Sequence, residues 1–145
     1  MFNATYQSEL KEFLKDRISL SESTRANYAR GEDTYDPILS QAVAFPESNE
    51  EVSKILKICN KYKIPVVPFG TGTSLEGNVV GNENGITISL EKMNKILSVN
   101  AEDFDCRVQA CVTKEQLNEY LREDGVFFPI DPGANAAIGG MASTS

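Results

Sequence analysis

Hydrophobic residues follow a helical period near the N-terminus, and helix and strand periods alternate further along the chain. The first apolar stripe predicts a peripheral helix over residues 5–16, because three of its residues share one helix face. These are Leu10, Phe13 and Leu14. The polar stretch of residues 19–37 predicts an irregular connection with one helical turn at 23–29, and Tyr28 and Tyr35 are candidates to anchor it to the domain surface.

A strand, a helix and a second strand follow. Residues 42–46 are typical of a short strand, and Ser48 with Glu51 forms a capping box that predicts a helix start. The apolar stripe of this helix is Val52, Ile55, Leu56 and Cys59, and Pro65 ends it. The β-branched run at 66–69 predicts the next strand. This order, with short connections, indicates a right-handed parallel βαβ unit, in which ligands bind beyond the carboxyl ends of the strands.

Strand and helix patterns return in the second half of the chain. Residues 86–90 alternate and predict a half-buried strand, and residues 93–99 predict a turn and another short strand. Residues 106–112 alternate again. A second capping box, Thr113 with Gln116, predicts a helix that ends at Gly125. Its buried stripe is expected to be Leu117, Tyr120 and Leu121. These elements indicate a second α/β layer that begins near residue 103.

The loop after residue 69 carries the candidate chemistry. It contains three glycines and three hydroxyl side chains: Gly70, Thr71, Gly72, Thr73, Ser74 and Gly77. Glycine admits positive φ, and successive backbone N–H groups in such a loop form a concavity that binds anions. The dinucleotide fingerprint G-x-G-x-x-G fails at Leu75, and no Gly-Lys-Ser/Thr follows. From the glycines alone, a phosphate site and a tight surface loop both stay open.

Composition and charge narrow the classes of function. The length of 145 residues suits one domain, and a net charge of −7 disfavours nucleic acid and anionic membrane surfaces as partners. No apolar run reaches the length of a membrane span, and the N-terminus lacks the regions of a signal peptide. We therefore expect a cytoplasmic protein, or one held at a membrane periphery by the rest of a longer parent chain.

Cysteine and histidine usage excludes several chemistries. The chain has no histidine, so Ser-His and Cys-His nucleophiles and histidyl metal ligands are excluded within it. Cys59, Cys106 and Cys111 form no C-x-x-C pair, and we expect buried, reduced thiols. No metal site is predicted.

Three segments in this order resemble the FAD-binding domain of the FAD-linked oxidases, of the vanillyl-alcohol oxidase or p-cresol methylhydroxylase type. They are residues 68–77, 128–134 and 139–144. The likeness is greatest to the branch of the D-lactate dehydrogenases (cytochrome) and glycolate oxidase flavoprotein subunits, and it covers roughly residues 38–145. Three ordered segments are more specific than one glycine loop.

The resemblance implies an α+β fold, sandwich-like, of the p-cresol methylhydroxylase type. Residues 1–37 would form an N-terminal helix and linker, and residues 38–145 the N-terminal part of the FAD-binding domain. Its first βαβ subdomain, about 38–100, would be complete, and the second, about 103–145, would be truncated.

The resemblance also implies FAD as the cofactor, bound without a covalent link because no histidine is present. The residues implied to bind it are Phe69, Gly70, Thr71, Gly72, Thr73, Ser74, Gly77, Asn78, Pro132, Gly133, Ala134, Ile138, Gly139, Gly140, Ala142 and Ser143. Asn78 stands where relatives often carry glycine. For Gly139 and Gly140 a simple helix start is the alternative, but the upstream loop favours a turn that faces the ligand. Asp131 is assigned to its own turn and not to catalysis.

The parent protein then resembles an FAD-dependent dehydrogenase or oxidase that passes a hydride from a small 2-hydroxy acid, such as D-lactate or glycolate, to FAD. An electron-acceptor protein or a homo-oligomer would be its partner. Neither a catalytic residue nor a metal ligand is expected in these 145 residues, and we expect the chain to be a fragment without turnover of its own. The alternative is a non-catalytic α/β module that binds another phosphorylated ligand. An FMN or nicotinamide enzyme is a weaker hypothesis.

Overall fold

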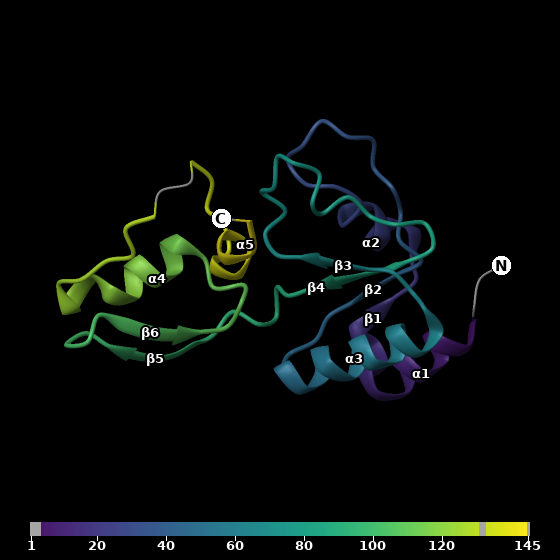
Figure 1. The fold of residues 1–145 in the computed structure, drawn as a ribbon, viewed down its shortest axis with the longest axis horizontal. Coiled ribbons are helices and arrows are strands. Elements are labelled where there is room, and N and C mark those ends of the chain that lie inside the picture. The colour runs from purple at the N-terminus through teal and green to yellow at the C-terminus, as the bar shows by residue number, and fades with distance from the viewer. Residues whose placement is uncertain (1–3, 131–132, 145) are drawn as a thin grey trace.

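The structure is a computed structural model that describes residues 4–130 and 133–144. It has two lobes, which the chain joins between β4 and β5 (Figure 1). The first lobe contains α1 (Ala4–Leu14), η1 (Lys15–Arg17), β1 (Ile18–Ser19), α2 (Glu22–Asn27), β2 (Ala42–Ala44), α3 (Asn49–Tyr62), β3 (Val66–Phe69) and β4 (Ile86–Ser89). The second contains β5 (Ile96–Asn100), β6 (Asp105–Val108), α4 (Lys114–Leu121), η2 (Arg122–Asp124) and α5 (Ile138–Thr144).

The first lobe is built on a four-stranded sheet of order β1-β2-β4-β3. Strands β2, β4 and β3 are parallel, and β1 runs antiparallel to β2. The predicted βαβ unit is therefore present as β2, α3 and β3, with β4 inserted between its two strands. Residues 70–85 make the crossover from β3 to β4 without a helix, so the glycine-rich stretch is itself the connection between two parallel strands.

Strand β4 is buried on both faces, whereas its alternating pattern predicted a half-buried strand. Thr87 and Ser89 have no exposed surface. Helices α1 and α3 lie on one side of the sheet, and α2 with the loops near it lies on the other (Figure 1). The Thr87 hydroxyl donates to Ser40 Oγ at 2.8 Å, which satisfies this polar group in the covered face. The polar residues of the alternating pattern thus face a second packed layer and not solvent.

Helix α1 belongs to the main core, so the expectation of a peripheral helix was wrong. Tyr6, Leu10 and Leu14 are at most 1% exposed and pack in one cluster with Ile55 and Ile86. The Tyr6 hydroxyl also donates to Gln41 Oε1 at 2.7 Å.

Helix α3 begins as predicted, because the Ser48 hydroxyl accepts from the Glu51 N–H at 3.2 Å. Its buried stripe differs from the prediction, since Leu56 is 45% exposed and Ile58 takes a core position. The helix ends at Tyr62, and its C-cap residue Lys63, two residues before Pro65, has a left-handed backbone at φ 56°.

The second lobe has its own core around Val112, Leu117 and Leu121. Thr113 caps α4 as predicted by accepting from the Gln116 N–H, and Gly125 ends the following turn at φ 70°. Tyr120, predicted to be buried, is 59% exposed. Strand β5, which lies within the predicted first subdomain of about 38–100, pairs with β6 and packs in this second core. The subdomain boundaries themselves stay a prediction.

The three cysteines are free thiols. Cys59 and Cys111 are buried as expected, but Cys106 is exposed, because β6 belongs to a sheet of only two strands. Among residues 4–130 and 133–144, no helix is long and apolar enough to cross a bilayer, and no group of three acidic, cysteine or histidine side chains is placed to hold a metal.

Candidate functional site

Residues 70–78, here called the glycine loop, leave the carboxyl end of β3 without regular structure. Gly72 and Gly77 have φ of 76° and 72°, a backbone region that other residues rarely adopt. A Cβ atom on Gly72 would also lie 2.8 Å from the Phe69 ring. Both the backbone conformation and steric overlap therefore disfavour a side chain at this position. Asn78 has no positive φ, and its place after Gly77 therefore requires no glycine.

The backbone of the glycine loop keeps its hydrogen-bonding capacity. Within the described part of the chain, the N–H groups of residues 71–76 donate to no other group. Two hydroxyls, those of Thr71 and Thr73, lie 3.3 Å apart on the same loop. Glu76 is exposed. Consecutive unpaired N–H groups with hydroxyls beside them can bind a phosphate without a cationic side chain.

The glycine loop forms the first wall of the candidate site. The chain that leads into α5 forms a second wall. The N–H groups of Ile138 and Gly139 donate to Val112 O and Ala110 O at 2.9 and 2.8 Å. A Cβ atom on Gly139 would lie 2.8 Å from Ala110, whereas one on Gly140 would meet nothing within 4 Å. Because α5 begins at Ile138, Gly139 and Gly140 lie in the first turn of a helix. The sequence had favoured a turn that faces the ligand over this helix start. Gly139 serves packing, and Gly140 faces open space.

The two walls meet at Ala137. Its N–H donates to the Thr71 hydroxyl at 3.3 Å, and a Cβ atom on Gly70 would lie 3.3 Å from the Ala137 methyl group. Figure 1 shows α5 between the two lobes, beside the end of β3. Residues 69–74 and 138–140, predicted from separate segments, are thus brought to one place at the carboxyl end of a parallel strand, where open α/β sheets bind ligands. Ala137, which joins them, was not predicted.

Other predicted residues are less closely grouped. Pro132 and Asp131 lie outside the described residues. Gly133, Ala142 and Ser143 are exposed, and the Ser143 hydroxyl donates to Gly139 O at 2.7 Å, so its hydrogen is engaged within α5. Ala134 is half-buried and its carbonyl accepts from the Ala136 N–H at 2.9 Å.

Sequence reasoning missed the contact between Tyr28 and Phe69, the residue that precedes the glycine loop. Its ring packs edge to face on Phe45 and on Phe69, with ring centroids 5.6 and 5.0 Å apart. The Tyr28 hydroxyl donates to Glu91 at 2.5 Å, and burial together with this carboxylate raises the pKa of Tyr28 to about 12. The hydroxyl therefore stays protonated at neutral pH. The sequence signalled only that Tyr28 anchors its segment.

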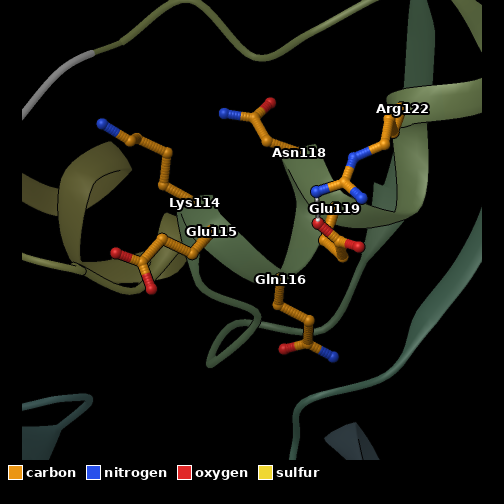
Figure 2. A pocket seen from close by; sticks show the side chains of 6 residues that line it. All are labelled: Lys114, Glu115, Gln116, Asn118, Glu119 and Arg122. Carbon is orange, nitrogen blue, oxygen red and sulfur yellow. Dashed lines mark hydrogen bonds and ion pairs between the residues drawn. The ribbon is translucent and has the colours of Figure 1, made fainter.

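Two surface hollows lie elsewhere. One of about 590 Å³ is lined by Lys114, Glu115, Gln116, Asn118, Glu119 and Arg122. Figure 2 shows these side chains fanning outward from α4, with Arg122 paired to Glu119. The other, of about 530 Å³, follows the outer face of α3. The first hollow is lined by α4 and η2 and the second by α3 alone, so neither has a facing wall, and neither includes a residue of the glycine loop.

Residues 40–145 match the model of a family described as an FAD binding domain. The chain is 44% identical over 128 residues to a probable mitochondrial D-lactate dehydrogenase of Danio rerio, covering 88% of this chain and 26% of that protein. It is 40% identical over 139 residues to the mitochondrial D-lactate dehydrogenase (cytochrome) of Arabidopsis thaliana, covering 94% and 24%. It is 34% identical over 104 residues to the glycolate oxidase subunit GlcD of Bacillus subtilis, covering 70% and 22%.

Solved structures share the fold. An alkyldihydroxyacetonephosphate synthase matches with a TM-score of 0.89 and 23% identity over 99% of this chain and 29% of its own. A p-cresol methylhydroxylase with bound substrate matches with a TM-score of 0.72 and 24% identity over 85% and 25%. The fold class inferred from the resemblance is confirmed. The chain spans about a quarter of the length of the relatives that it matches.

Proposed function

Because the chain belongs to the FAD binding domain family, we propose that the glycine loop holds the pyrophosphate of FAD and that residues 133–143 form part of a second wall along the cofactor. One observation carries this proposal. The N–H groups of residues 71–76 have no acceptor within the described chain, and Ala137 of the second wall contacts the same loop. Unpaired donors at the end of a parallel strand fit the chemistry of a pyrophosphate group.

The residues present fit this cofactor in a second respect. A Cβ atom on Gly70 would lie 3.3 Å from the Ala137 methyl group, so the two walls approach closely there, while Gly72 and Gly139 pack on Phe69 and Ala110 within their own lobes. Gly140 leaves open space on the second wall. With no histidine in the chain, no histidyl link to the flavin can form within it, which supports the proposal of a non-covalent cofactor.

We extend the proposal to the whole protein that contains this chain. Relatives named D-lactate dehydrogenase and glycolate oxidase subunit support a flavin-dependent oxidation of a small 2-hydroxy acid. The flavin, when bound, supplies the hydride acceptor, and this chain's part is to bind the cofactor and keep its backbone in place. Family membership does not favour the alternative of a non-catalytic module for another phosphorylated ligand.

An equilibrium titration of the purified chain with FAD, ADP and FMN, followed by flavin fluorescence and by competition, tests the proposal. We expect saturable binding of FAD and of ADP and little binding of FMN, because FMN lacks the pyrophosphate and the adenosine. Absence of FAD binding both to the chain and to the longer protein that contains it would contradict the proposal. Equal affinity for all three ligands would favour the module for another phosphorylated ligand.

A further inference from the structure

The segment between α2 and β2 lies against the glycine loop. We call residues 28–40 the N-terminal strap. In Figure 1 this strap and the loop run side by side above the sheet of the first lobe. Two hydrogen bonds tie them together, from the Glu32 N–H to Gly72 O and from the Gly81 N–H to Ala29 O, both 2.9 Å long. The strap therefore contacts the loop near its start, at Gly72, and just beyond its end, at Gly81.

Gly31 of the strap lies directly on two loop carbonyls. A Cβ atom at this position would lie 2.5 Å from Gly72 O and 3.0 Å from Ser74 O, so no other residue fits without displacing the loop. In a trans peptide the N–H points opposite to the C=O. Because the carbonyls of Gly72 and Ser74 face the strap, the N–H groups that follow them in the chain point to the side away from it. That is the side on which the donors are unpaired.

Asp33 folds the strap into this position. It is only 8% exposed, and its two carboxylate oxygens accept from the N–H groups of Gly31 at 3.1 Å and of Tyr35 at 3.0 Å. The resulting turn carries the Tyr35 ring onto the loop, where it would lie 2.8 Å from a Cβ atom on Gly77. One carboxylate thus fixes the two residues that press on the loop.

We propose that the strap is a positioning element of the cofactor site, with Asp33, Gly31 and Tyr35 as positioning residues that hold the N–H groups of the glycine loop toward the ligand. The inference rests on the proposed function for the identity of the ligand. The dependence of the loop's conformation on the strap does not require a ligand and is tested separately.

The test compares Asp33→Asn with Asp36→Asn by ¹H–¹⁵N NMR. Each variant removes one negative charge from the strap, but Asp36 is exposed and has no hydrogen bond within the described residues. Asparagine at position 33 replaces one acceptor oxygen by a donor that faces an N–H, so one of the two bonds is lost. We expect amide shifts at residues 71–78 in Asp33→Asn alone, and faster exchange of the Glu32 amide by about tenfold. The Ile86 amide, which bonds Pro65 O, serves as reference.

A second pair of variants, Tyr35→Ala and Tyr35→Phe, keeps the inference testable if Asp33→Asn fails to fold. Tyr35 is 54% exposed, so its replacement should leave the fold intact. We expect the alanine to move the Gly77 amide and the phenylalanine, which keeps the ring, to restore it. Unchanged loop shifts in Asp33→Asn and in Tyr35→Ala would overturn the inference.

An FAD titration of the same proteins separates this failure from failure of the proposed function. Weaker FAD binding by about tenfold in Asp33→Asn, with the affinity of Asp36→Asn unchanged, supports both the proposed function and the role of the strap. Shifted loop amides with unchanged FAD affinity would reduce the strap to packing and overturn its role in the site. If neither the unsubstituted chain nor the longer protein binds FAD, but the loop amides respond to Asp33→Asn, the proposed function fails and the strap's control of the loop stands.

Discussion

Gly72 and Gly125 have almost the same backbone conformation, at φ 76° and 70°, but different surroundings. A Cβ on Gly72 would meet the Phe69 ring at 2.8 Å, and one on Gly125 would meet nothing within 4 Å. Gly72→Val should therefore disturb the loop locally and weaken FAD binding by at least about tenfold, since a left-handed backbone alone costs a residue about 1–2 kcal/mol. Fluorescence titration measures the affinity, and far-UV circular dichroism should stay near that of the unsubstituted chain.

Gly125→Val is the matched control, because it introduces the same backbone strain away from both walls. It should lower thermal stability with little change in FAD affinity. If Gly72→Val and Gly125→Val bind FAD alike, the glycine loop is not part of the cofactor site.

Single residues were predictable where their reason is local. The spacing of Gly70, Gly72 and Gly77 after a β-branched run indicated a loop that needs positive φ, and two of these three glycines have it. Gly31 gave no such signal, because the carbonyls that exclude a side chain there belong to Gly72 and Ser74, far along the chain. A close approach between distant segments leaves no period in the sequence.

Helix α1 contributes core residues to the first lobe, and its loss should be costly. Leu10 is fully buried, and Leu10→Ala should lower the free energy of unfolding by about 2–5 kcal/mol through lost burial and a residual cavity. Urea denaturation followed by circular dichroism measures this change. Lys11→Ala, an exposed position on the same helix, should stay within about 0.5 kcal/mol of the unsubstituted chain. Equal effects at the two positions would restore the peripheral helix predicted from the sequence.

An ion pair joins η1 to the start of α3. The Arg17 guanidinium contacts both carboxylate oxygens of Glu51 at 2.5 Å, and these hydrogen bonds lower the pKa of Glu51 below its ordinary value of 4.5. Below pH 4.5 the unfolded chain therefore binds more protons at Glu51 than the folded chain does, and stability falls as the pH falls through the folded pKa. Above pH 4.5 the full contribution is present.

Glu51→Gln should remove this contribution. We expect a loss of about 1 kcal/mol at neutral pH and a shallower fall in stability below pH 4.5, because both side chains are partly exposed and the bond is charge-assisted. Thermal unfolding from pH 3 to pH 7 measures the difference, with the exposed Glu12→Gln on α1 as control. A parallel pH profile for Glu51→Gln and the unsubstituted chain would show that the pair contributes nothing measurable.

At the scale of elements, helix starts were the most predictable feature. Ser48 and Thr113 accept the N–H three residues on, as their spacing predicted. The bonds of their partner side chains were not predictable. Glu51 accepts from Arg17 on a distant segment as well as from the Glu47 N–H, and the Gln116 amide donates to Asn94 O. The burial of whole helix faces was harder to predict than the helix starts. Leu56 and Tyr120 fit a helical stripe but are 45% and 59% exposed.

At the scale of the whole chain, the described residues form two separate hydrophobic cores, and the candidate site draws one wall from each lobe. The Gly81 amide reports on the first wall through its bond to Ala29 O, and the Gly139 amide reports on the second through its bond to Ala110 O. Each bond lies within its own lobe. Local opening at either wall can therefore be followed independently of the other.

A cofactor that spans both walls must slow the opening of both, whereas a ligand held by the glycine loop alone slows only the first. Binding that is confined to the closed state lowers local exchange by a factor of one plus the ratio of free ligand to Kd, so FAD at 100 times Kd should slow the Gly81 and Gly139 amides by up to about 100-fold. ADP, which lacks the flavin, should protect Gly81 more than Gly139. Hydrogen exchange of the FAD-saturated chain measures both, with the Ile86 amide at the amino end of β4 as reference. Protection of Gly81 without Gly139 under FAD would remove residues 133–143 from the site and leave the loop as the sole contact.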